Sequence, residues 1–186
     1  MNVLYLTENM SKYLAASYQN EFLNACANEF NVIKYGPGYA NYSRKDTLKD
    51  INSKFGLKID LIIFGHKFLS DHQFTSILPN LNFSHIKKIP KIFILNKEYV
   101  NFDYKLSFIK KNKFNLCITH HHEYKKYEKI TNTDFIFLPF AVNFEKFDKI
   151  DLKKKYHLSF SGILQNQNKS SFQNDLRIRI MKKLFY

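Results

Sequence analysis

The chain has 186 residues, 45% of them hydrophobic, with 19 Phe, 12 Tyr and a formal net charge of +13. This apolar and aromatic content excludes disorder over most of the length, and the length predicts one globular domain with an appendage. Charges or prolines interrupt every apolar run before the ~20 residues that a membrane-spanning helix needs. The first residues, Met1 to Thr7, lack the basic leader and cleavage region of a signal peptide, so a cytoplasmic location is expected.

Strands and helices alternate in the first part of the chain. A strand is predicted over residues 2–7 and a helix over 13–30, where apolar side chains recur at helical spacing and Ser11 is the expected N-cap. A second strand, 31–35, stops at the turn Gly36-Pro37-Gly38. A shorter helix follows over 47–55 and ends at Gly56.

Four further apolar runs are predicted as strands. They cover residues 59–64, 91–95, 116–119 and 135–138, with a helix over 104–111 between two of them. Nearly continuous apolar strands are typical of parallel sheets whose two faces are both covered by helices. The sequence therefore predicts an α/β fold with a doubly wound, mainly parallel, Rossmann-like sheet and flanking helices.

Two cysteines, Cys26 on a predicted helix and Cys117 in a predicted strand, lie far apart and are expected to be small buried apolar residues. Lysines recur in pairs and triplets at predicted helix ends and connections. Their charge leaves open a solvated surface, nucleic acid, phosphorylated substrates or an anionic membrane surface. A peripheral position at the inner face of the membrane is therefore compatible with the cytoplasmic expectation.

Polar side chains gather where the predicted strands end. Because parallel strands bring their carboxyl ends to one edge, and open α/β sheets bind ligands there, these side chains are candidates for substrate contact. Glycine before His66 permits close approach of backbone to a ligand. The candidates for substrate binding are Asn9, Gly65, His66, Asn96, Lys97, His120, His122 and Asn143.

Glu98 is the candidate for catalysis, because a carboxylate at a strand end can accept a proton from an acceptor hydroxyl. The neighbouring Lys97 leaves a surface ion pair as the alternative. Three consecutive histidines, 120–122, invite a metal and with Glu123 could bind one adventitiously, but no Cys or acidic ligand set completes a convincing site. No metal and no cofactor is therefore predicted. Consecutive residues of an extended segment point to opposite faces, so at most His120 and His122 are expected to share a side.

Two short segments near the carboxyl end of the chain carry a family resemblance. The run Leu138-Pro139-Phe140-Ala141-Val142-Asn143, followed by Phe144 and Phe147, resembles the strand end before the inter-domain linker of GT-B glycosyltransferases, especially the CgeB-like spore-maturation enzymes. The run from Leu158 to Gly162 is similar to the first strand and glycine turn of their nucleotide-sugar domain. Arg177 and Arg179 are similar to the arginine after that turn.

The resemblance implies three parts: an acceptor-side domain over 1–143, a linker over 144–155, and the first strand and helix of an incomplete donor-side domain over 156–186. It implies transfer of a sugar from a nucleotide sugar to a saccharide or cell-surface glycan, with Gly162 and Arg177 binding the nucleotide sugar. It also implies that this chain is inactive without the rest of the donor-side domain.

Other readings of the same sequence stay open. One is a non-catalytic partner subunit that keeps the acceptor-binding fold. Another is a basic nucleic-acid-binding α/β domain, which the charge and the many aromatic rings favour. The aromatic residues fall mainly within apolar runs and no nucleic-acid-binding motif is present, which disfavours nucleic acid. The predicted last helix, 172–185, has an apolar face that predicts a homodimer contact.

Overall fold

The computed structural model describes residues 1–11, 17–67, 81, 86–98, 100–139, 179 and 183. The chain divides into two compact units, Met1–Phe147 and Asp148–Tyr186. Only Arg179 and Lys183 of the second unit are described, so the fold reported below is that of the first. The predictions for Asn143, the linker 144–155, the strand and turn 156–162, Arg177 and the helix 172–185 lie outside the described residues.

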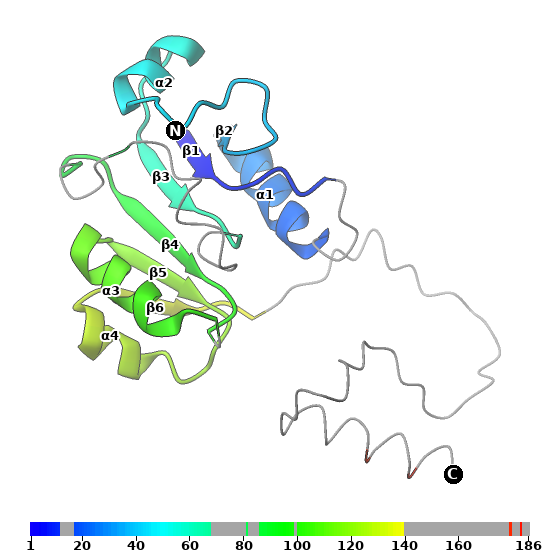
Figure 1. Ribbon diagram of the computed structural model, residues 1–186, viewed down its shortest axis with the longest axis vertical. Helices are drawn as coiled ribbons and strands as arrows, with labels where there is room; N and C mark the ends of the chain where they lie inside the picture. The colour runs from blue at the N-terminus through cyan, green and yellow to red at the C-terminus, as the bar shows by residue number, and fades with distance from the viewer. Residues whose placement is uncertain are drawn as a thin grey trace. The chain divides into compact units, whose positions relative to one another are not determined.

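The first unit is an α/β fold built on a six-stranded sheet, which confirms the predicted fold class (Figure 1). The strand order is β2-β1-β3-β4-β5-β6, and every neighbouring pair is parallel. The strands are β1 (Asn2–Leu6), β2 (Asn31–Tyr35), β3 (Leu61–Phe64), β4 (Lys91–Leu95), β5 (Leu116–Thr119) and β6 (Asp134–Phe137). The described helices are α1 (Ser17–Glu29), α2 (Leu48–Phe55), α3 (Phe102–Asn112) and α4 (Lys125–Thr131).

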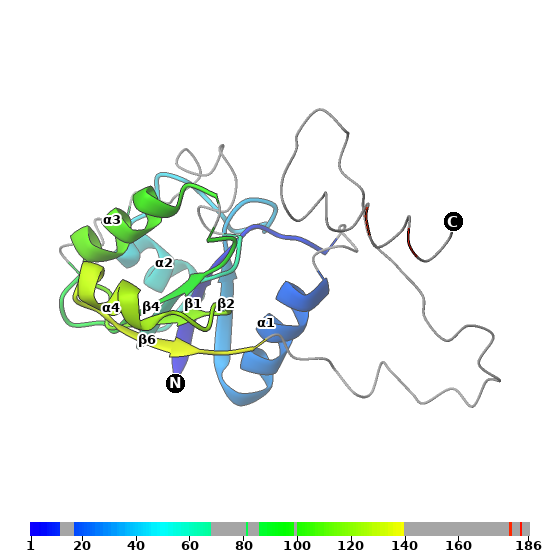
Figure 2. The same ribbon diagram turned by 90° about the horizontal axis from the view of Figure 1, so that it is seen from below.

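Helices cover both faces of the sheet, as a doubly wound fold requires (Figure 2). Alternate residues of each strand point to opposite faces. On one face Leu4 and Leu6 of β1 share a core with side chains from α2, α3 and α4. On the other face Val3 and Tyr5 of the same strand pack with Leu23 of α1. Both faces of the central strands are therefore buried, which explains why these strands read as continuous apolar runs.

Capping interactions at both ends explain where the polar helix α2 begins and ends. Thr47 lies just before the helix, and its side chain accepts from the backbone N–H of Asp50, while Asp50 bonds back to the N–H of Thr47. This capping box satisfies two N–H groups that the first turn leaves without helical partners. Gly56 ends the helix in the left-handed conformation at φ 63°. The prediction that the helix starts at residue 47 is wrong by one residue, because Thr47 is its cap.

Two helices differ from the prediction. The helix expected over 104–111 begins two residues earlier, at Phe102, and α4 was not predicted. Only Tyr127 and Thr131 of α4 are buried, so its seven residues carry too little apolar periodicity to identify a helix. The helix predicted over 13–30 would start within residues 12–16, which lie outside the described part. The expected cap at Ser11 is therefore not tested. Among described residues no helix is long and apolar enough to cross a membrane.

The two cysteines differ in burial. Cys117 in β5 is buried, as predicted, and burial raises the pKa of its thiol. Cys26 on α1 is only partly buried, so the expectation of a fully buried residue is wrong there, although burial also raises the pKa of this thiol. Both cysteines are free thiols.

Candidate functional site at the carboxyl edge of the sheet

The strand order places a topological switch point between β1 and β3. The chain leaves β1 for β2 on one side and then returns past β1 to β3 on the other. Ligands of open α/β sheets bind in the crevice at such a point, outside the carboxyl ends of the strands. The residues that follow the two strands here are Thr7-Glu8-Asn9 and Gly65-His66-Lys67. The ammonium of Lys67 lies 3.9 Å from a carboxylate oxygen of Glu8, so a charged pair spans this point.

On the β2 side of β1, two loops are joined by backbone and amide contacts. The backbone N–H of Asn9 donates to the carbonyl of Pro37 at 2.8 Å, and the Asn9 side-chain amide donates to the carbonyl of Gly38 at 3.1 Å. The Asn9 side-chain oxygen accepts from the backbone N–H of Ser11 at 3.1 Å. The predicted substrate contact Asn9 thus joins the two loops through its backbone N–H and its side-chain amide, while its side-chain oxygen stabilises its own loop.

Close packing explains why residue 65 is a glycine, and the sequence did not indicate this. A Cβ on this residue would lie 2.4 Å from a ring carbon of Tyr5 and 3.1 Å from Cβ of Thr7. The side chains of Tyr5 and Thr7 therefore occupy the space next to Gly65 in which the sequence interpretation expected a ligand. The absence of a side chain at Gly65 lets the end of β3 approach β1 closely at the switch point.

His66 and His120 form a stacked pair at the carboxyl edge. Their ring centroids are 5.3 Å apart and the ring planes differ by 12°. Phe22 of α1 meets His66 edge-on at 5.2 Å. His66 is 2% exposed. Burial, helped by the neighbouring His120, lowers the pKa of His66 to about 3, so His66 is neutral at physiological pH.

A backbone carbonyl fixes the tautomer of His120. Nδ1 of His120 lies 2.6 Å from the carbonyl oxygen of Leu138, just after β6. A carbonyl oxygen only accepts hydrogen bonds, so Nδ1 carries the proton and neutral His120 has its lone pair on Nε2. The same contact ties the end of β5 to the end of β6, next to the hydrogen bond from the N–H of Leu138 to the carbonyl of Thr119.

Glu98 is held by a hydroxyl from the neighbouring strand. The hydroxyl of Thr119, a fully buried residue at the end of β5, donates to Oε1 of Glu98 at 2.7 Å. The same hydroxyl accepts from the backbone N–H of His121 at 3.1 Å. With its proton committed to the carboxylate and its oxygen to an N–H, Thr119 positions Glu98 at the junction of β4 and β5. This contact differs from the surface ion pair that was the alternative for Glu98.

A buried lysine of α3 holds the turn that follows β4. Lys105 of α3 is 0% exposed, and its ammonium donates to the carbonyl of Asn96 at 2.6 Å and to that of Lys97 at 2.9 Å. Lys97 is left-handed at φ 53°, a conformation uncommon outside glycine. Asn96 in turn donates its side-chain amide to the carbonyl of His66 at 3.3 Å. Two predicted substrate residues, Asn96 and Lys97, thus form the scaffold that joins β4 to β3 and carries Glu98.

The expectation that, of the three histidines, at most His120 and His122 share a side is wrong. The rings of His121 and His122 stack on each other at 5.0 Å with their planes 15° apart, while His120 stacks on His66. The alternation of an extended segment fails because β5 ends at Thr119 and the chain turns immediately afterwards. His122 is exposed, outside the pair formed by His66 and His120.

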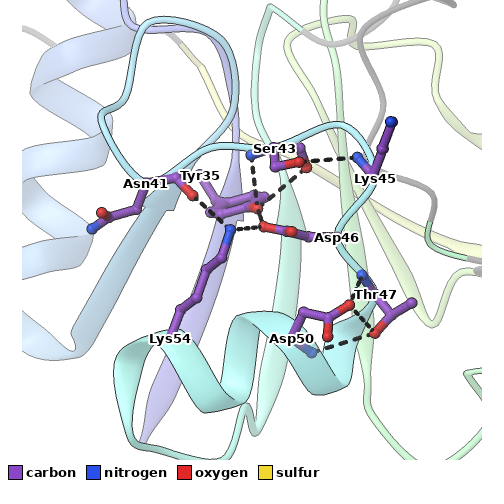
Figure 3. A network of polar contacts seen from close by, with 8 residues as sticks. All are labelled: Tyr35, Asn41, Ser43, Lys45, Asp46, Thr47, Asp50 and Lys54. Atoms are coloured by element: carbon purple, nitrogen blue, oxygen red, sulfur yellow. Dashed lines mark hydrogen bonds and ion pairs between the residues drawn. The ribbon is translucent and has the colours of Figure 1, made fainter.

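A second polar cluster lies in the loop that follows β2 (Figure 3). The hydroxyl of Tyr35, the last residue of β2, donates to the carboxylate of Asp46, which also accepts from the ammonium of Lys54. The Tyr35 hydroxyl accepts from the backbone N–H of Ser43 at 3.1 Å. Lys54 reaches the carbonyl of Asn41 at 3.4 Å. The cluster ties the loop to α2 and to the end of the sheet.

Loss of the Tyr35 hydroxyl is expected to destabilise the fold. Tyr35→Phe leaves the Ser43 N–H and the Asp46 carboxylate each short of one partner, which costs about 1–2 kcal/mol of unfolding free energy. Urea denaturation followed by circular dichroism measures this loss. Lys45→Ala is the matched control, because only the backbone of Lys45 contacts the cluster. An equal loss in both variants would contradict the assignment.

The same cluster predicts that the free energy of unfolding decreases at acid pH. Hydrogen bonds from Lys54 and then Tyr35 lower the pKa of Asp46 below its ordinary value. A carboxylate whose folded pKa is depressed stabilises the fold above its unfolded pKa of about 3.9, and this contribution disappears as pH falls through the lower folded pKa. Asp46→Asn is therefore expected to be less stable than the wild type at neutral pH and to approach it at acid pH. Denaturation curves over this range check the convergence.

Several residues of the site were missed from the sequence. Thr119 is a hydroxyl at the end of an apolar strand, and that position was a signal that could have found it. Lys105 lies on the buried stripe of α3 with Leu106, Ile109 and Asn112, so helical periodicity alone marked it as an unusual lysine. The partnership of Tyr35 with Asp46 had no local signal.

Chemically, the described edge offers a carboxylate, imidazoles and hydroxyls rather than a metal centre. Among described residues no group of three His, Cys, Asp or Glu side chains is arranged to hold a metal ion. The fold defines a Rossmann-like α/β domain with a topological switch point between β1 and β3, the kind of place at which open α/β sheets bind ligands. No family model, no curated protein and no solved structure matches the chain.

Proposed function

We propose that residues 1–143 form the acceptor-side domain of a glycosyltransferase with the GT-B fold, resembling the CgeB-like enzymes. The reaction is transfer of a sugar from a nucleotide sugar to a saccharide or cell-surface glycan. In this proposal the acceptor binds at the carboxyl edge of the sheet, and residues from 156 onward, with Gly162 and Arg177, contribute to binding the donor. The doubly wound sheet with its switch point supports the proposal.

The observation that carries the proposal is the environment of Glu98. Thr119 holds its carboxylate at the carboxyl edge, where an acceptor hydroxyl can present its proton. In the described segments that follow the strands, cations and carboxylates are equal in number: Arg44, Lys45, Lys67 and Lys97 against Glu8, Asp46, Glu98 and Glu123. With His66 neutral as well, this edge suits an uncharged, hydroxyl-rich ligand better than a polyanion.

Two measurements test the proposal: saccharide binding by this chain, and sugar transfer by a protein that also supplies the rest of the donor-side domain. Saturation-transfer NMR with a panel of oligosaccharides is expected to give signals from at least one saccharide, while a single-stranded oligonucleotide gives none. In a transfer assay of that longer protein with nucleotide-sugar donors, Glu98→Gln is expected to lower the rate by about 100-fold or more, because the amide cannot accept the proton. Saccharide binding is expected to be retained, since the amide oxygen can still accept from Thr119.

The outcomes separate the alternatives. Saccharide binding without transfer from any donor, even when the rest of the donor-side domain is supplied, would identify the chain as a non-catalytic partner subunit. Oligonucleotide binding without saccharide binding would replace the proposal with the nucleic-acid function. Lys45→Gln is a suitable control for Glu98→Gln, because its exposed side chain is remote from Glu98 along the sheet edge and is expected to change neither measurement.

A further inference from the structure

We propose that the amino edge of the sheet, opposite the ligand edge, is a docking face for an anionic membrane surface. The amino edge consists of the segments that lead into the strands together with the last turns of the helices. In Figure 1 it is the side from which the strand arrows start, near the N label. This inference is independent of the proposed sugar transfer.

Lysines are concentrated on one part of this edge. The strands β3, β4 and β5 are neighbours in the sheet, so the segments entering them lie side by side. Six exposed lysines occupy these segments and the last turn of α3: Lys58, Lys87, Lys88, Lys110, Lys111 and Lys113. Among the described residues of the same segments the one carboxylate is Asp60, which already accepts from the N–H of Asn2 at 2.8 Å.

The electrostatic effect of this cluster is visible on a neighbouring group. Lys91, at the start of β4, is buried, and its ammonium donates to the carbonyl of Asn112 at 2.6 Å. Burial, and then the positive charge of Lys113, lower the pKa of Lys91. The positive charges of this edge thus act on one another, whereas the opposite edge is balanced. An anionic surface would relieve this repulsion.

Apolar side chains accompany the lysines. Ile130, at the end of α4 beside α3, is 51% exposed, and Phe30, at the entry to β2, is 41% exposed. Lys129 precedes Ile130 and is exposed as well. Lysines interspersed with an aliphatic and an aromatic side chain are typical of a face that rests in the headgroup region of a membrane. Each lysine near such a surface is expected to strengthen binding about fivefold.

A membrane fits this edge better than a nucleic acid. The chain has only 3 Arg among its 29 basic residues, and arginine is the residue that recognises phosphates in pairs of hydrogen bonds. Binding of single strands uses exposed aromatic rings that stack on bases. Here Phe64 of β3, Phe93 of β4 and Phe114 are buried, which leaves Phe30, at the entry to β2, as the exposed ring among the described aromatic residues named for this edge. The aliphatic Ile130 offers a base no stacking surface but can enter lipid.

The test is sedimentation of the full chain with vesicles of equimolar phosphatidylglycerol and phosphatidylcholine. Binding is expected at low salt, to weaken as salt rises, and to be absent with phosphatidylcholine alone. The triple variant Lys88→Gln, Lys110→Gln, Lys111→Gln is expected to bind about 100-fold more weakly. The matched control is Lys34→Gln, Lys45→Gln, Lys49→Gln, which removes the same charge from exposed positions elsewhere and is expected to bind nearly as the wild type.

A second pair of variants tests the apolar contribution. Ile130→Ser is expected to lower vesicle binding about fivefold, whereas Tyr104→Ser, at the other end of the adjacent helix, changes little. Circular dichroism spectra and melting curves establish that all variants are folded. The proposal is overturned by absence of binding to the anionic vesicles, by equal losses in the two triple variants, or by binding of an oligonucleotide through the same lysines without vesicle binding.

Discussion

Gly36→Ala is expected to lose about 4 kcal/mol of unfolding free energy, the largest effect we predict for a single methyl group in this chain. Gly36 follows β2 with φ 152°, a conformation that residues with side chains rarely adopt. A Cβ there would lie 2.0 Å from the carbonyl oxygen of Thr7 and 2.8 Å from its carbonyl carbon. The added methyl group therefore meets backbone, not a side chain that can rotate away.

The backbone at Thr7 has little freedom to move. Its N–H donates to the carbonyl of Tyr35 at 3.0 Å, which closes the parallel pairing of β1 with β2. β1 is also paired with β3 on its other side, so a shift of Thr7 disturbs two strand pairs. We therefore expect the clash to separate the ends of β1 and β2 and to release the contacts that Asn9 makes with the loop after β2.

Gly56→Ala is the matched control. Gly56 also has a positive φ, 63°, but a Cβ there would meet no atom within 4 Å. Its substitution isolates the cost of the backbone conformation, about 1 kcal/mol. Urea denaturation followed by far-ultraviolet circular dichroism compares the two variants. If Gly36→Ala fails to fold while Gly56→Ala stays folded, the clash is even more costly than expected and the prediction holds. Equal losses of unfolding free energy in the two variants would contradict it.

The strands and their polar ends were predictable from local sequence. Each strand core is an apolar run whose two faces are both buried, so Leu4 and Tyr5 carry the same signal although they face different cores. The turns and caps at Gly36 and Gly56 were also local. Strand order was not predictable, because pairing of β1 with β3 depends on contacts between segments about sixty residues apart.

The sequence predicted which edge of the sheet carries the candidate site, but not which groups contact one another there. Parallel topology identified Glu98, His66 and His120 as neighbours of one rim. Which groups hold them was set by nonlocal contacts: Thr119 reaches Glu98 from another strand, and the carbonyl of Leu138 orients His120. The histidine triplet failed as a prediction because the alternation of a strand was applied past the end of the strand.

The second large effect is expected for Lys105→Met, which should lose about 3 kcal/mol of unfolding free energy. Methionine fills nearly the same volume but has no donor for the carbonyls of Asn96 and Lys97, which remain in the buried site. Replacing a buried charge by an apolar residue is often tolerated when its partners are replaced as well. Here the partners are backbone groups, so the loss cannot be offset in that way.

Lys105→Met should also loosen the turn that carries Glu98. The N–H of Val100 donates to the carbonyl of Lys97 at 2.9 Å, and this carbonyl accepts from Lys105 as well. Hydrogen exchange of the Val100 amide is therefore expected to accelerate beyond what the loss of global stability explains. Lys110→Met, an exposed lysine on the same helix, is the control and is expected to change stability by less than about 0.5 kcal/mol.

The comparison between the two lysines separates charge from position. Both variants remove one ammonium from α3, so net charge and helix propensity change almost equally. If Lys105→Met proved as stable as Lys110→Met, the bonds to the two carbonyls would contribute no net stability. If it were destabilised while Val100 exchanged only in step with global unfolding, Lys105 would support the core of the domain without positioning the turn. Local acceleration at Val100 is the result expected of a residue that positions Glu98.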